Sequence, residues 1–154
     1  MRMDIGQLYS RQNVGLLNNY LQVIADFSSV TWNTQAKHEI AIVTGLVQVY
    51  IIPECIEDLV GAGSIQLGNE SLTNDYIAST VATAIDNEEV WLTTTPTKFL
   101  NMSNVIKQIV NGLDIGYEIT GAALSGGKIK FHIFWEPINQ TTQGSVEAGL
   151  GNTL

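Results

Sequence analysis

The chain has 154 residues, with 15 acidic residues against 7 lysines and arginines and a formal net charge of -8. This length suits one domain with a substantial core. The acidic balance argues against nucleic-acid binding and against binding to anionic membranes, because both require basic patches. Only 14% of the residues are charged and 45% are apolar. Two interpretations stay open: a β-rich protein with uncharged polar loops, or a subunit that buries much of its surface in an assembly.

Residues 1–28 differ from the rest of the chain because they lack strand alternation. A helical spacing links Leu16, Leu17, Tyr20, Leu21 and Ile24, which predicts a helix over residues 14–26. The alternative is an extended arm that lies on a neighbouring subunit. The start of this segment has no apolar signal-peptide core, and no apolar run in the chain reaches about 18 residues, so no transmembrane helix is expected.

Residues 30–32 predict a short strand, and residues 38–52 predict the longest strand unit of the chain. Gly45 divides this unit, and Pro53 ends it. If the register continues through Gly45, one face carries Ile40, Ile42, Leu46, Tyr50 and Ile52, and the other carries Ala41, Val43, Val47, Val49 and Ile51. Because both faces are apolar, we expect cover on both, partly from another chain.

The middle of the chain alternates between strand and non-strand patterns. Residues 64–68 predict a strand with Ile65 and Leu67 inward. Residues 74–84 predict a short helix or turn, because Ile77, Val81 and Ile85 are four residues apart. Residues 90–93 predict another strand, whereas residues 105–110 suit either a helical turn or a strand.

The strongest strand signal lies near the end of the chain. Residues 114–120 and 128–135 alternate between apolar and polar side chains, which predicts a hairpin with one buried face. The residues expected in the core are Ile115, Tyr117, Ile119, Ile129, Phe131, Ile133 and Trp135. Residues 138–154 have little to bury, so we expect them to form a tail that packs against other chains.

No group of residues specifies a chemistry. Cys55 is the only cysteine, which excludes an intrachain disulfide, and a small buried side chain is favoured over a catalytic thiol paired with His38 or His132. The acidic groups Glu54, Glu57 and Asp58, or Asp86, Glu88 and Glu89, lack calcium-loop spacing. Trp32, Trp91 and Trp135 could stack on sugars, but Trp91 and Trp135 lie on predicted inward faces. We therefore expect no catalytic residue, no cofactor and no metal site.

Together these patterns predict an all-β fold: an antiparallel β-sandwich or jelly-roll-like domain with one short helix and an N-terminal arm. The expected segments are an N-terminal arm or helix (1–28), the β-sandwich (29–138) and a C-terminal tail (139–154). The expected interface residues are Leu8, Tyr9, Leu16, Leu17, Tyr20, Leu21 and Tyr50.

The order of several motifs resembles a known group of proteins. After the long apolar strand come Gly61-Ala-Gly-Ser-Ile-Gln-Leu-Gly68, then Ile77-Ala-Ser-Thr-Val-Ala-Thr-Ala-Ile-Asp86 and Glu89-Val-Trp91, and the last strand ends in Trp135-Glu-Pro137. This order, over residues 30–138, is similar to small virion proteins of tailed bacteriophages, which often close on a strand ending in Trp-x-Pro.

The resemblance implies a β-sandwich structural protein without enzymatic activity. It implies a capsid decoration protein that binds the major capsid protein as a homotrimer on the outside of the head, in a virion assembled in the host cytoplasm. The alternatives are a tail, neck or head-fibre component and, from a different class, a carbohydrate-binding β-sandwich.

Overall fold

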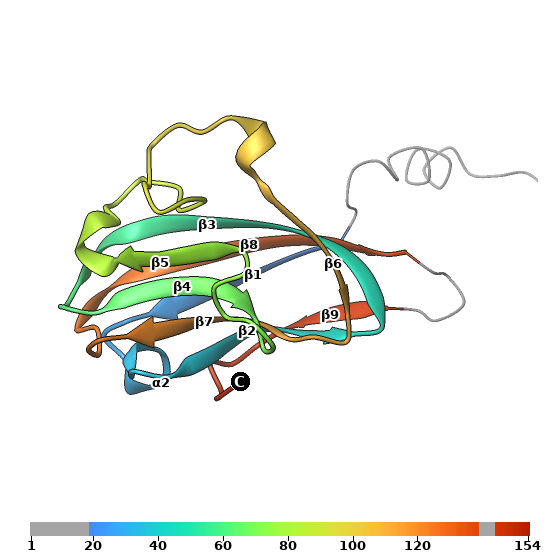
Figure 1. Ribbon diagram of the computed structural model, residues 1–154, viewed down its shortest axis with the longest axis horizontal. Helices are drawn as coiled ribbons and strands as arrows, with labels where there is room; N and C mark the ends of the chain where they lie inside the picture. Colours follow the sequence, from blue (N-terminus) through green and yellow to red (C-terminus); the bar gives the residue numbers. More distant parts are fainter. Residues whose placement is uncertain (1–18, 139–143) are drawn as a thin grey trace, which may run out of the picture.

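The computed structural model describes residues 19–138 and 144–154, and it is an antiparallel β-sandwich (Figure 1). This confirms the predicted all-β fold class. One sheet has four strands in the order β1-β8-β3-β6, and the other has five in the order β5-β4-β7-β2-β9. The strands of the first sheet are β1 (Asn19–Asp26), β8 (Gly126–Pro137), β3 (Leu46–Val60) and β6 (Ile106–Asn111). Those of the second sheet are β5 (Ile77–Val81), β4 (Ser64–Asn69), β7 (Ile115–Thr120), β2 (Lys37–Thr44) and β9 (Ser145–Ala148).

The long apolar unit is two strands rather than one. Gly45 has φ +71°, a conformation that glycine adopts without steric cost, and there the chain passes from β2 in one sheet to β3 in the other. Ala41, Val43, Val47, Val49 and Ile51 are buried between the sheets, as is Ile40, which lies at a register shift in β2. On the opposite face, Ile42, Leu46, Tyr50 and Ile52 are half-buried.

The predicted hairpin of residues 114–120 and 128–135 is wrong, although its buried face is confirmed. Strand β7 lies in the five-stranded sheet and β8 in the four-stranded sheet. The core residues are nevertheless the expected ones, because an inward face looks the same whether its neighbour is a hairpin partner or an opposing sheet. The buried side chains are Ile115, Tyr117, Ile119, Ile129, Phe131 and Ile133, whereas Trp135 is half-buried.

The boundary drawn at residue 28 is also wrong. Residues 19–26 form β1, which pairs antiparallel with β8 over its whole length. Val23, Ala25 and Phe27 are buried in the core. The predicted helix over residues 14–26 is therefore a strand from residue 19 onward, and residues 14–18 lie outside the described part of the chain. These residues form a strand despite their helical spacing, because β8 supplies a backbone partner along the whole of β1.

Three shorter predictions need correction. Residues 30–33 form the single-turn helix α2 (Val30–Asn33), capped by Ser29, rather than a strand. Residues 77–81 form β5, and only η2 (Ala82–Ala84), a 3-10 turn, is helical there. Residues 90–93 are not a strand, since Val90 makes isolated bridges only. A second 3-10 turn, η3 (Met102–Asn104), precedes β6, which settles the ambiguous segment as a strand.

The C-terminal segment belongs to the sandwich. Strand β9 pairs with β2, Val146 is buried, and the Gly149 and Gly151 amides donate to the Ile40 and Glu39 carbonyls at 2.9 and 3.0 Å. The expectation that this tail needs other chains is wrong for residues 144–154, because backbone pairing holds a segment that has few apolar side chains to bury. Residues 139–143 lie outside the described chain. In the part of the chain that the structure describes, no helix is long and apolar enough to cross a membrane.

Candidate functional site

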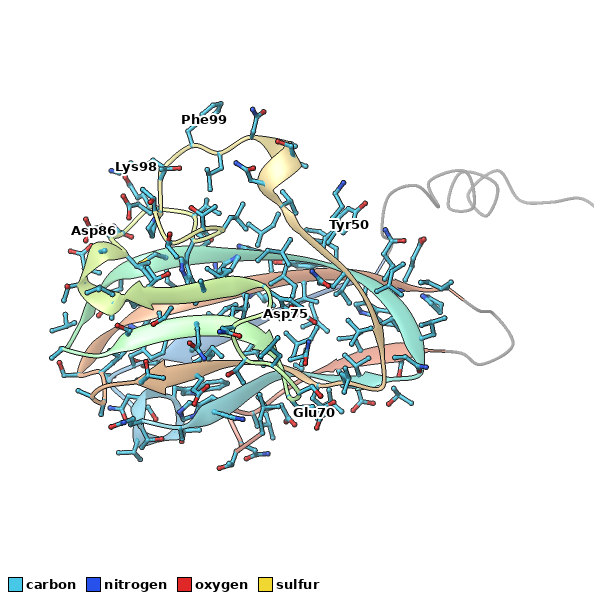
Figure 2. All side chains as sticks on the ribbon, viewed as in Figure 1. Tyr50, Glu70, Asp75, Asp86, Lys98 and Phe99 are labelled. Atoms are coloured by element: carbon cyan, nitrogen blue, oxygen red, sulfur yellow. The ribbon has the colours of Figure 1, made fainter. Side chains whose placement is uncertain are left out.

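The outward side of the four-stranded sheet carries three aromatic side chains in one row. Tyr20 on β1 pairs with Phe134 on β8, Phe134 with Tyr50 on β3, and Tyr50 with Lys107 on β6. Residues paired across neighbouring strands share a face of the sheet. The Tyr20 and Phe134 ring centroids are 4.8 Å apart, and the Lys107 ammonium lies 5.9 Å from the Tyr50 ring centroid. Figure 2 shows Tyr50 on the outside of the sandwich, close to β6.

We name this surface the aromatic face. It comprises the outward residues Tyr20, Gln22, Ile24, Asp26, Gln48, Tyr50, Ile52, Glu54, Glu57, Lys107, Ile109, Lys128, Lys130, His132, Phe134 and Glu136. Several of its apolar side chains are well exposed: Tyr20 at 49%, Ile24 at 41% and Ile109 at 67%. Isolated exposed apolar residues are ordinary, and Ile24 and Ile109 lie on opposite edge strands, so the contiguous part of this surface is the row of Tyr20, Phe134 and Tyr50.

A hydrogen-bonded chain of three side chains crosses the centre of the aromatic face. The Tyr20 hydroxyl lies 2.7 Å from His132 Nδ1, and His132 Nε2 lies 3.0 Å from Glu54 Oε1. Gln22 Oε1 lies 3.1 Å from the same hydroxyl and is a second acceptor for its one proton. The Tyr20 and His132 rings are stacked at 18°. Each member comes from a different strand, so the sheet register alone assembles the set.

The order tyrosine, histidine, carboxylate matches the hydrogen-bond logic of a nucleophile, its base and an orienting group. Acyl transfer also needs donors for the developing negative charge. The row partners of this set are Ile24, Ile52 and Phe134, whose side chains donate no hydrogen bond, and Gln22 and Lys130, whose side chains can donate.

The aromatic face differs from the rest of the chain in charge. The described residues contain 5 lysines and 14 acidic residues. Three of those lysines and four of the acids lie on this face: Lys107, Lys128, Lys130, Asp26, Glu54, Glu57 and Glu136. The remaining two lysines and ten acids give the rest of the described chain a charge of -8, whereas the aromatic face is close to balanced. The Lys128 ammonium is 2.8 Å from Glu57 Oε2.

Neither His38 nor His132 is paired with the Cys55 thiol. The Cys55 side chain is buried, where its thiol donates to the Glu57 carbonyl at 3.2 Å and burial raises its pKa to about 11. His132 faces outward from the same sheet, and His38 on the other sheet contacts the Thr34 and Gly151 carbonyls. The expected small buried cysteine is confirmed.

The acidic groups that we considered for a cation have other partners. Glu57 pairs with Lys128, Glu88 with Lys98 at 3.1 Å, and Asp58 accepts from the Asn87 amide at 2.6 Å. Within residues 19–138 and 144–154, no group of three or more acidic, histidine or cysteine side chains is arranged to hold a metal ion.

Of the expected interface residues, Tyr20 and Tyr50 lie in one row of the aromatic face, on either side of Phe134. The sequence did not predict that they share a row. Leu21 faces inward and is half-buried, while Leu8, Tyr9, Leu16 and Leu17 lie outside the described residues. Phe134 and His132 were not among the interface residues expected from the sequence. Their signal was the alternation within β8, where both occupy outward positions opposite the recognised core residues.

The three tryptophans that could stack on sugars are buried or partly buried. Trp91 is fully buried, and its indole N–H donates to Thr80 Oγ1 at 3.0 Å. Trp32 and Trp135 are half-buried against the core.

Comparison with known proteins finds no matching family, no matching curated protein and no matching solved structure.

Proposed function

We propose that this protein is a structural virion component of a tailed bacteriophage, a capsid decoration protein that binds the outer surface of the capsid lattice. The observation that supports a structural role is the aromatic face, where the row of Tyr20, Phe134 and Tyr50 lies among polar side chains whose charges nearly balance. Such a surface suits stable contact with another protein. A rigid sandwich that presents one binding face is what a head-stabilising subunit requires.

The assignment to a virion rests on the order of motifs from the long apolar strands to Trp135-Glu-Pro137. This assignment implies that the major capsid protein is the partner and that the assembled form is a homotrimer. The acidic character supports a place on the outside of the head, because the inner surface faces DNA and would repel an acidic chain. A tail, neck or head-fibre component is the alternative within the virion.

The test is quantitative mass spectrometry of gradient-purified phage particles that encode this sequence. A decoration protein is expected at a copy number comparable to that of the major capsid protein. A copy number of a few per particle would instead assign the chain to the neck, tail or a fibre. Its absence from intact particles would overturn the virion proposal.

A second candidate is carbohydrate binding. The row of Tyr20, Phe134 and Tyr50, flanked by the Gln22 and Gln48 amides, favours it. Aromatic rings supply apolar faces for stacking, and amides supply paired hydrogen bonds. The burial of Trp91 argues against the tryptophan platform considered from the sequence. A glycan array probed with the full chain and with Tyr50→Ala distinguishes this function, since specific binding lost in the variant would support it.

A further inference from the structure

We propose that the loop of residues 91–105 is a docking element, and that its tip, which carries Phe99 and Met102, inserts into an apolar pocket of the capsid shell flanked by basic side chains. The inference rests on the proposed function, because it takes the identity of the partner from there. It goes further by naming the part of the chain that makes the contact and the chemistry of the surface that receives it.

The loop is a closed excursion from one edge of the four-stranded sheet. Before it, Val90 bridges to Glu54 of β3, and after it, Ile106 pairs with Ile51 of the same strand. Glu54 and Ile51 lie about 10 Å apart along β3, at about 3.3 Å per residue. The 15 residues from 91 to 105 therefore leave the sheet and return to it at nearly the same place. Surface loops of this length whose ends lie close together are frequently functional.

The tip of this loop exposes two large apolar side chains. Phe99 is 89% exposed and Met102 is 74% exposed. Phe99 is the most exposed large apolar side chain in the part of the chain that the structure describes, and Figure 2 shows it at the outer end of the loop. A single exposed apolar residue is ordinary. Two of them near the end of one projecting loop form an anchor of the kind that fills a pocket on a partner protein.

Hydrogen bonds hold the loop in this shape. At its base, the Val90 amide donates to the Thr97 carbonyl at 2.8 Å. Nearer the tip, Thr97 Oγ1 donates to the Phe99 carbonyl at 2.8 Å, and the Val105 amide donates to the Met102 carbonyl at 3.2 Å. Because these bonds order the loop before any contact forms, docking costs less conformational entropy than it would for a flexible segment.

Charge identifies the kind of partner. Lys98 is the one charged residue of the loop, and its ammonium is 3.1 Å from Glu88 Oε2. The turn before the loop contains Asp86, Glu88 and Glu89, and Asp58 accepts a backbone hydrogen bond from this turn at 2.6 Å. These four carboxylates and one lysine leave a local charge of -3 beside a neutral apolar tip. The complementary surface is apolar at its centre and basic at its edge.

The same charges disfavour two other occupants. A second copy of the chain has a net charge of -8 and repels the acidic turn. An anionic membrane surface repels it as well. The aromatic face does not compete with the loop, because Tyr50 and Phe99 extend on the same, upper side of the sandwich in Figure 2. Contact through the loop is therefore compatible with contact through that face.

The test is cosedimentation of the purified full chain with capsid shells from phage mutants that lack it. The wild type is expected to bind. Phe99→Glu and Met102→Glu each place a charge in the apolar contact, and each should weaken binding by about tenfold or more. Val30→Glu is the matched control, because Val30 is 78% exposed and belongs to α2, on the other side of the sandwich (Figure 1). This control should leave binding unchanged.

Asp86→Lys tests the basic edge of the pocket. Asp86 is exposed, and its replacement reverses a charge beside the loop without changing the tip. Binding of the wild type should weaken as the salt concentration rises, and Asp86→Lys should lower both the affinity and its dependence on salt. Wild-type binding that does not respond to salt would overturn the basic edge.

Circular dichroism and urea midpoints establish that each variant is folded. Phe99→Ala, a milder change at the same position, keeps the test decisive if Phe99→Glu does not fold. It should also weaken binding by about tenfold or more.

The outcomes separate this inference from the proposed function. Unchanged binding of Phe99→Glu and Met102→Glu overturns the inference and leaves the virion role standing. Failure of the wild type itself to bind the shells contradicts the proposed decoration function and this inference together. Self-association in sedimentation velocity that Phe99→Glu abolishes, with shell binding intact, assigns the tip to a second copy and overturns the inference. Binding to phosphatidylcholine vesicles that Phe99→Glu abolishes, again with shell binding intact, assigns the tip to a lipid surface and also overturns it.

Discussion

Phe131→Ala is the most direct test of the core packing. Phe131 is fully buried on β8 and stacks on Tyr117 of the opposite sheet, with ring centroids 5.9 Å apart and an interplanar angle of 8°. Truncation of a buried phenylalanine removes its transfer free energy and leaves a cavity, which together cost about 3–5 kcal/mol. The stacked pair places Phe131 toward the upper part of that range, because such pairs contribute about 0.5–1.5 kcal/mol beyond their buried area.

A loss of this size should be plain in equilibrium unfolding. For a domain of this length, each kcal/mol lowers Tm by about 2–4 °C, so the variant should melt roughly 6–20 °C below the wild type. Urea unfolding followed by circular dichroism measures the free energy, and an unchanged m-value would show that the unfolded state is unaffected.

The matched control is Phe99→Ala, which removes the same side chain from a position that is 89% exposed, in the loop before β6 (Figure 2). This variant should stay within about 0.5 kcal/mol of the wild type. A Phe131→Ala protein that loses less than about 1 kcal/mol would refute the inward register of β8, and with it the placement of His132 and Phe134 on the aromatic face.

Three further predictions use different parts of the molecule. Deletion of residues 1–26 removes β1 with Val23 and Ala25 from the core, and it should abolish or strongly lower the cooperative melt seen by circular dichroism; an unchanged melt would contradict the assignment of β1 to the sandwich. Burial raises the Cys55 pKa to about 11, so a thiol reagent at pH 8 should label it only on the unfolding timescale, and rapid labelling without denaturant would contradict this. Burial first, and then the carboxylates of Asp114 and Glu70, raise the Glu39 pKa. Its proton is therefore bound more tightly in the folded state, and its stabilising contribution is full below the unfolded pKa of about 4.3 and is lost as the pH rises through the folded pKa. Glu39→Gln should flatten that part of the urea-midpoint curve, and a variant curve that parallels the wild type would count against the coupling.

The sequence by itself determined the class of fold and most of the core. Alternation in residues 114–120 and 128–135 identified the inward set from Ile115 to Ile133, and the structure buries every one of those six side chains. The lone cysteine was also correctly placed in the core. These successes share a cause: the period of two depends only on the strand itself, and a strand has one buried side whichever neighbour provides the cover.

Only the tertiary structure decided which strands are neighbours. The link between β2 and β3 at Gly45, the placement of β7 and β8 in different sheets, and the pairing of β9 with β2 all depend on contacts between residues far apart in the chain. The same holds for the aromatic face. Tyr20, Tyr50 and Phe134 are separated by 30 or more residues, and only the registers β1 to β8 and β3 to β8 bring them into one row. No local pattern encodes that row, because register is set by the fit of whole sheets, and the outward positions of a strand acquire meaning only when their partners are known.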